Sequence, residues 1–278
     1  MDWFRTTAAC DAGGDMVELG MARRESIRHL SVGHGEIPVR AAAEGRMGRV
    51  WVPLPEESSF CLISLGAFSY LLGLPPRGAE SIDLYLTICR ECADTNIVPD
   101  STLWCEWLEE QFAGRFRTSA RYALSAPEQV ETACGRNTAA ALPDLVRLKK
   151  LDAAWYRRAI KETEQVDFVS IFADEEQFLQ FGIGYLALHG NRIVGGCAAY
   201  AFPEGLMEVK VATAEAYRNK GIATALTSRL LEDCADSGIE RRWEAANLFS
   251  SRMAEKFGYR PDREYMIYRI EVDHSEEE

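Results

Sequence analysis

The chain has 278 residues, of which 47% are apolar and 27% charged, so it is long enough for about two globular domains. These proportions exclude a chain that is disordered throughout. Asp and Glu outnumber Lys and Arg by 43 to 31, which gives a net charge of −12. So negative a balance disfavours binding to the phosphate backbone of a nucleic acid, and it agrees with a cationic partner.

The sequence gives no sign of a membrane segment, a secretory signal or a metal site. Its most apolar stretch, residues 60–74, is interrupted by serines and glycines and falls short of the roughly 18 apolar residues of a membrane span. The N-terminus lacks the basic and apolar regions of a signal peptide, so we expect a cytoplasmic protein whose eight cysteines are reduced. Cys89 and Cys92 form a lone C-x-x-C pair with no histidine nearby, which is too few ligands for zinc.

The first part of the chain, residues 1–117, is predicted to be a small α+β domain. About the first 45 residues show little pattern. A strand is expected over residues 49–52, because the prolines that follow end it. The apolar residues 60–74 indicate a buried strand, a turn, and then either a second strand or the start of a helix.

Residues 102–112 have a helical period, which places Leu103, Trp107 and Leu108 on one side of a helix. Trp104 and Trp107 are interleaved with three glutamates. This pattern suits either a buried helix face with a solvated acidic side or an aromatic surface for a cationic ligand. We favour the buried face.

The second part, residues 118–278, alternates predicted strands and helices, which is typical of an α/β or mixed domain. Asp174 fits the N-cap of one helix, and Gly182 fits the left-handed position that ends it. Gly190 suits a hairpin, and no internal sequence repeat of useful length is visible. Strands are expected at residues 146–152, 184–189, 192–200, 206–213, 241–246 and 264–270, and helices at residues 153–162, 174–181, 219–235 and 249–257.

The most informative segment is residues 208–224, where a strand leads through a short loop into the long helix. Free N–H groups at a helix start, together with the helix dipole, attract an anion. Gly221 has no Cβ, so a diphosphate could approach the backbone there, and Arg218 and Lys220 add positive charge. The loop is neither a Walker A nor a G-x-G-x-x-G motif. Taken alone, these residues also fit an ordinary strand–loop–helix junction.

The loop RNKGIA, residues 218–223, and the segment WEAANLFSSRMAEKFGY, residues 243–259, together resemble the GNAT (Gcn5-related) N-acetyltransferase superfamily. The second segment is similar to a branch of bacterial two-domain GNAT enzymes related to the zwittermicin-resistance acetyltransferase. The likeness covers about residues 50–270 and is weakest in the first half. It implies a mixed α+β fold, in which a smaller α+β domain precedes a GNAT domain with a mostly antiparallel central sheet flanked by helices.

The resemblance also implies acetyl-CoA as the co-substrate and direct transfer of the acetyl group to an amine. Backbone groups near Val209 and Val211 would bind the pantetheine arm, in a slot left where the strand at 241–246 splays away. Asn247 and Ser250 would lie near the cofactor, although Asn247 is equally suited to capping a helix. The diphosphate would bind the amides of Arg218, Asn219, Lys220, Gly221, Ile222, Ala223 and Thr224.

Glu208 matches the glutamate that takes the amine proton, through water, in many members of the superfamily. A carboxylate can serve as a general base in this way, but a surface carboxylate at a strand start is an equal alternative. Many members also have a tyrosine that protonates the departing thiolate, and Ala254 stands at that position. Water would then supply the proton, because Tyr259 is expected to pack in the core.

The resemblance thus predicts an acetyl-CoA-dependent N-acetyltransferase that acts on a primary amine of a small molecule. Two other functions stay open. Ala254 in place of the tyrosine allows a non-catalytic regulatory module that binds acyl-CoA, and the acceptor could instead be a protein or peptide amine. Nucleic acid and membranes are not expected as partners, and a homodimer is one open option for assembly.

Overall fold

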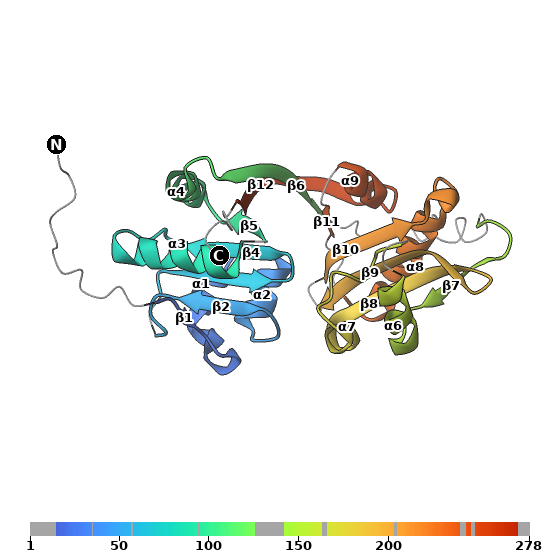
Figure 1. Cartoon of the computed structure of the whole chain (residues 1–278), viewed down its shortest axis with the longest axis horizontal. Helices are drawn as coiled ribbons and strands as arrows, with labels where there is room; N and C mark the ends of the chain where they lie inside the picture. The colour runs from blue at the N-terminus through green and yellow to red at the C-terminus, as the bar shows by residue number, and fades with distance from the viewer. Residues whose placement is uncertain are drawn as a thin grey trace, which may run out of the picture. The chain divides into compact units, whose positions relative to one another are not determined.

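The computed structural model describes residues 15–34, 36–56, 58–93, 95–125, 142–162, 166–202, 205–239, 243–245 and 248–271. The chain divides into two compact units, one of Met1–Thr118 with Ile267–Glu278 and the other of Ser119–Met266. Both units combine helices with mostly antiparallel strands (Figure 1). The predicted mixed α+β fold is therefore confirmed. No helix in these ranges is long and apolar enough to cross a membrane.

The first unit is built on strands hydrogen-bonded in the order β1-β2-β3-β4-β5-β12. Neighbours from β1 to β4 are antiparallel, whereas β4 and β5 are parallel. Strands β6 (Phe116–Ser125) and β12 (Arg260–Ile270) each begin in one unit and end in the other. The other elements are β1 (Val17–Glu18), the 3₁₀ helix η1 (Met21–Ile27), α1 (Arg28–Ser31), α2 (Ile37–Ala43), β2 (Arg49–Val52), β3 (Phe60–Leu65), β4 (Phe68–Gly73), α3 (Ala79–Glu91), β5 (Asn96–Pro99) and α4 (Thr102–Phe112).

The core of the first unit forms around the tryptophans of α4. Trp104 and Trp107 are both buried and pack edge to face, while the neighbouring glutamates are exposed, so the predicted buried face is confirmed. The indole N–H groups donate to Gly73 O and Ser81 Oγ, each at 2.9 Å, which satisfies the polar atom of each ring. The placement of Leu103 on this face is wrong, because Trp104 takes the inward position and leaves Leu103 52% exposed.

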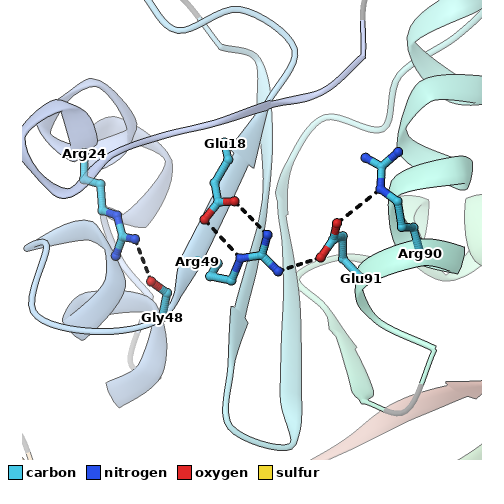
Figure 2. A network of polar contacts seen from close by, with 6 residues as sticks. All are labelled: Glu18, Arg24, Gly48, Arg49, Arg90 and Glu91. Carbon is cyan, nitrogen blue, oxygen red and sulfur yellow. Dashed lines mark hydrogen bonds and ion pairs between the residues drawn. The ribbon is translucent and has the colours of Figure 1, made fainter.

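A network of charged side chains connects β1, β2 and α3 in the first unit (Figure 2). Arg49 donates to both carboxylate oxygens of Glu18, at 3.0 and 2.7 Å, and to Glu91 at 2.5 Å. Nearby, the buried Arg24 donates to the carbonyl oxygens of Met47 and Gly48. The network joins β2 to β1 and to the end of α3, although exposed ion pairs contribute only about 0–1 kcal/mol each.

The second unit holds two separate groups of strands. One is a four-stranded antiparallel sheet in the order β10-β9-β8-β7, and in the other β6 lies between β12 and β11. Its elements are β7 (Val146–Lys150), α6 (Ala153–Lys161), α7 (Glu175–Phe181), β8 (Gly182–His189), β9 (Arg192–Phe202), β10 (Gly205–Thr213), the 3₁₀ helix η2 (Glu215–Tyr217), α8 (Ile222–Asp236), β11 (Trp243–Ala245) and α9 (Leu248–Glu255).

For α7, the N-cap predicted from the sequence is confirmed, whereas the predicted conformation of the glycine that ends the helix is wrong. Asp174 caps this helix by accepting the Gln177 N–H at 2.8 Å, as predicted. Gly182 does not adopt the left-handed conformation, because its φ is −94° and it opens β8 directly. A Cβ at this position would approach the Phe178 ring to 2.3 Å. The glycine is therefore needed for close packing rather than for a turn.

Two adjacent glycines of β9 show what covers each face of the four-stranded sheet. A Cβ on Gly195 would meet Ile222 and Leu226 of α8, whereas a Cβ on Gly196 would collide with the Phe168 ring at 2.3–2.4 Å. Successive residues of a strand point to opposite faces. Helix α8 and the segment around Phe168 therefore pack on opposite faces of this sheet.

The two units repeat one order of elements. In each half of the chain, from β1 to β6 and then from β7 to β12, a strand is followed by helical segments, three strands, a helix, a strand, a helix and a final strand. The first half has η1, which continues into α1, and α2 where the second has α6 and α7, and the second half adds η2 before α8. This repeat is not visible in the sequence, because the equivalent elements share their order rather than their residues. Helix α3 of the first unit thus corresponds to α8 of the second, and the pair β4–β5 corresponds to β10–β11.

Candidate active site

The site predicted from the sequence begins on β10, the edge strand of the four-stranded sheet. Met207 pairs with Tyr200 and Lys210 with Ala198, so two residues, Glu208 and Val209, stand opposite one residue of β9. This is a β-bulge, which takes a backbone N–H out of the ladder. The bulge falls on the predicted catalytic position, although the side chain of Glu208 lies outside the described part of the chain.

Strands β10 and β11 are neighbours in space but belong to different sheets (Figure 1). Among the described residues, β10 pairs only with β9, and β11 (Trp243–Ala245) pairs only with β6. The backbone donors and acceptors on this edge of β10, from the bulge to Val211, thus lack a strand partner within the described chain. Such an edge is suited to bind an extended ligand that carries amide groups.

The loop after β10 presents the start of α8. Asn219 and Gly221 have φ values of +59° and +78°, so both adopt the left-handed conformation. The first helical hydrogen bond runs from Ala225 N–H to Gly221 O at 2.9 Å, and no side chain caps the helix. The first amides of α8 are therefore oriented outward. A Cβ placed on Gly221 would meet no atom within 4 Å, so the turn is open.

Two cations lie in this loop, and both are held by neutral partners. The Arg218 guanidinium donates to Thr213 O at 3.4 Å. The Lys220 ammonium donates to Ala216 O at 2.9 Å and lies 5.3 Å from the centre of the Tyr217 ring. Neither pairs with a carboxylate in the described ranges, although the chain carries 43 acidic residues. Their charge is available to an anion at the helix start.

The second helix of the predicted site, α9, contributes less than the resemblance implies. Ser250 accepts a hydrogen bond from the Trp243 indole at 3.4 Å, which ties α9 to β11, and Asn247 lies outside the described residues. Ala254 is fully buried in the core, so no side chain at that position faces a ligand. Tyr259 is buried as expected and packs edge to face on Trp243.

A polar cluster beside the bulge was not found from the sequence. Lys210 of β10 donates to Asp167 at 2.5 Å and to Ser170 at 2.7 Å. Partial burial would raise the pKa of Asp167, but the hydrogen bonds from Lys210 and Ser170 outweigh it and hold that pKa below its usual value. The cluster connects the segment between α6 and α7 to β10. No local motif links residues so far apart in the chain.

Two other features of the sequence do not form a site. The six described cysteines are free thiols, and burial raises the pKa of Cys197 and of Cys234 to about 12. Within the described ranges, no group of three or more His, Cys, Asp or Glu side chains is arranged to hold a metal ion.

Comparison with known proteins identifies the class to which this fold and site belong. A model of the GNAT acetyltransferase family matches residues 29–268. The crystal structure of a GCN5-related N-acetyltransferase-like protein from Streptococcus suis 89/1591 is 29% identical, with a TM-score of 0.74 over 90% of this chain and 99% of that one. The family model defines the class, because it covers most of the chain. The chain belongs to the GNAT acetyltransferase family.

Two further comparisons mark the extent of the likeness. The uncharacterized N-acetyltransferase YdfB of Bacillus subtilis (strain 168) is 33% identical over 94 residues, so the match spans 33% of this chain and only 36% of that relative. A tandem GNAT protein from the clavulanic acid biosynthesis pathway has a TM-score of 0.57, over 94% of this chain and 99% of that one. At 12% identity the second comparison shows the fold alone.

Proposed function

We propose that this chain binds acetyl-CoA along β10 and at the start of α8, and that it transfers the acetyl group directly to a primary amine of a small molecule. The observation that carries the proposal is the pair β10–β11, whose strands are neighbours without belonging to one sheet. An extended pantetheine arm, with its two amides, fits an unpaired strand edge.

The residues present at the start of α8 fit the diphosphate of coenzyme A. The amides of Ile222, Ala223 and Thr224 precede the first intrahelical bond, and the open turn at Gly221 leaves room for phosphate oxygens. The cations of Arg218 and Lys220 lie in the same loop and are not neutralised by described carboxylates. Val209, Val211 and Ser250 complete the set that we assign to the co-substrate, together with Asn219 and Asn247.

The chemistry requires a donor for the developing oxyanion and a base for the amine. A backbone N–H released by the bulge at Glu208 and Val209 is suited to polarise the thioester carbonyl. We assign the base to Glu208, acting through water. The C–S bond breaks as the C–N bond forms, and the thiolate takes its proton from water because Ala254, at the position of the usual tyrosine, has no proton to donate. A thiol with a pKa of about 8.5 is a tolerable leaving group.

The acidic balance of the chain supports a cationic acceptor, since amines are protonated at neutral pH. A peptide amine and a regulatory role without turnover are the other two readings, and nucleic acid is disfavoured by the same charge. We place the GNAT domain at residues 118–278 and the enzyme in the cytoplasm, where the free thiols of the described cysteines would persist.

The test is an acetyl-CoA thiol-release assay on the full chain, with a panel of small amines and a set of peptides with free lysine and N-terminal amines. We expect turnover with at least one small amine and none above background with the peptides. Turnover on peptides alone would show instead that the acceptor is a peptide amine. Tight binding of CoA without turnover on any amine would favour the regulatory module.

A further inference from the structure

A histidine outside the predicted site contacts the loop assigned to the diphosphate. His189 is the last residue of β8, and it pairs with Arg192 across the hairpin. Its Nδ1 lies 2.6 Å from the hydroxyl of Tyr217, and the two rings meet edge to face, with centres 5.7 Å apart. Its place directly before Gly190 in the sequence indicates no more than a turn. The structure gives it a partner in η2.

Tyr217 continues this contact into the loop. The residue ends η2, its N–H donates to Ala214 O at 2.8 Å, and its half-buried ring packs against the core of the second unit. The Lys220 ammonium lies 5.3 Å from the centre of the same ring and also donates to Ala216 O, in the same short helix. His189, Tyr217 and Lys220 therefore form a continuous series of contacts, which ends one residue before Gly221.

The neutrality of these partners matters for an anion site. A carboxylate next to Lys220 would cancel its charge, whereas an aromatic face and a carbonyl oxygen hold the ammonium and leave its full charge. In the observed position of the Tyr217 ring, its face lies under Lys220 and its hydroxyl is hydrogen-bonded to His189. The hydrogen bond at the far edge of the ring thus fixes the surface on which the ammonium rests.

We propose that His189 is a positioning residue for coenzyme A, and that it holds Tyr217 so that Lys220 is directed to the diphosphate. This inference rests on the proposed function, because it assumes that the diphosphate binds at the start of α8. It adds the β8–β9 hairpin to the cofactor site. It also requires that the effect of His189 be confined to ligands that carry the diphosphate.

The experiment is calorimetric titration of the full chain with CoA and with pantetheine, which lacks the diphosphate. His189→Phe and Tyr217→Phe each remove one end of the hydrogen bond and keep an aromatic ring. We expect either variant to weaken CoA binding by about 3- to 10-fold, as for the loss of one hydrogen bond, with pantetheine affinity unchanged. The matched control is Asn191→Ala in the same hairpin, whose side chain contacts Arg158 instead, and it should leave both affinities unchanged.

A double-mutant cycle tests whether His189 acts through Lys220. Lys220→Gln should weaken CoA binding by itself, and adding His189→Phe to that variant should have no further effect. Additive losses, unchanged CoA affinity in both phenylalanine variants, or an equal loss for pantetheine would each overturn the inference. Absence of CoA binding in the wild-type chain would instead refute the proposed function, so the two failures are distinguishable.

Discussion

The two units repeat one order of elements, but they differ in whether the central pair of strands is hydrogen-bonded. In the first unit, β4 and β5 are paired in parallel from Phe68–Asn96 to Leu71–Pro99. In the second unit, the corresponding β10 and β11 are neighbours without pairing among the described residues. At this pair of strands, a free edge for a ligand is therefore present only in the second unit. The fold alone does not make the site. The site depends on whether this one pair of strands is joined by hydrogen bonds.

The helices that follow these strands share one feature and differ in another. Both α3 and α8 begin after a glycine with a positive φ, Gly78 (+63°) and Gly221 (+78°), and a Cβ on either would meet nothing within 4 Å. A pocket of about 720 Å³ at the start of α3 is lined by two carboxylates, Glu106 and Glu110, against one cation, Arg77, whereas two cations, Arg218 and Lys220, lie at the start of α8. The charge at the first helix thus opposes a diphosphate, and the charge at the second favours one.

The largest expected effect is a loss of stability in the first unit that leaves CoA binding in the second unit unchanged. Trp104→Ala removes a fully buried ring and should cost about 3–5 kcal/mol of unfolding free energy. Trp104→Phe keeps much of the volume and loses the hydrogen bond to Gly73, so its cost should be smaller. Denaturant unfolding gives both values. The fraction of Trp104→Phe that is folded should bind CoA with wild-type affinity, and a weakened affinity would contradict the assignment of the site to the second unit.

The two helix-start glycines allow a direct contrast between the units. Gly221→Asp places a carboxylate where the diphosphate should bind, and it should weaken CoA binding by about 100-fold or more, since a like charge next to a phosphate is unfavourable. Gly78→Asp makes the same change at the start of α3 and should leave CoA affinity unchanged. Gly221→Asn, which also tolerates the left-handed conformation, should lose less affinity than Gly221→Asp. Equal losses of CoA affinity at the two glycines, measured by calorimetry, would contradict the assignment of the diphosphate to the start of α8.

The catalytic assignment in the second unit predicts a change in the pH–rate profile. Glu208→Gln should lower turnover by about 100-fold at neutral pH, where the amine is protonated, because general bases typically contribute 10²–10⁴-fold. The deficit should shrink towards alkaline pH, where more of the amine is already neutral. A profile of unchanged shape, measured with an acceptor found in the thiol-release assay, would remove Glu208 from the mechanism.

The smallest effect concerns acid stability. Hydrogen bonds and ion pairs with Lys210 and with Lys150 outweigh partial burial and hold the pKa values of Asp167 and Asp233 below their usual range. Such carboxylates stabilise the folded state above about pH 4, the pKa in the unfolded chain, and this contribution is lost as the pH falls through the lower folded values. Urea unfolding of Asp167→Asn should therefore show a small deficit at pH 7 that disappears near pH 3. A deficit that is independent of pH would indicate lost packing instead.

The sequence predicted most of the elements and the basic loop, because helix periods, prolines and the glycine of a helix start are local signals. Leu103 shows the limit of such signals, since a helical period does not say which of two adjacent residues, Leu103 or Trp104, faces the core. The bulge at Val209 and the contact between Lys210 and Asp167 depend on pairing across the sheet. No run of neighbouring residues encodes either of them.

A crystal structure of the full chain with CoA would show directly whether the unpaired strands β10 and β11 of the second unit bind the co-substrate. We expect one CoA per chain, with the pantetheine arm hydrogen-bonded to the free edge of β10 beside β11 and the diphosphate at the amides that follow Gly221. A CoA bound at the start of α3, or a second copy in the first unit, would contradict this expectation. So would a structure in which β10 and β11 are joined by a continuous ladder of hydrogen bonds.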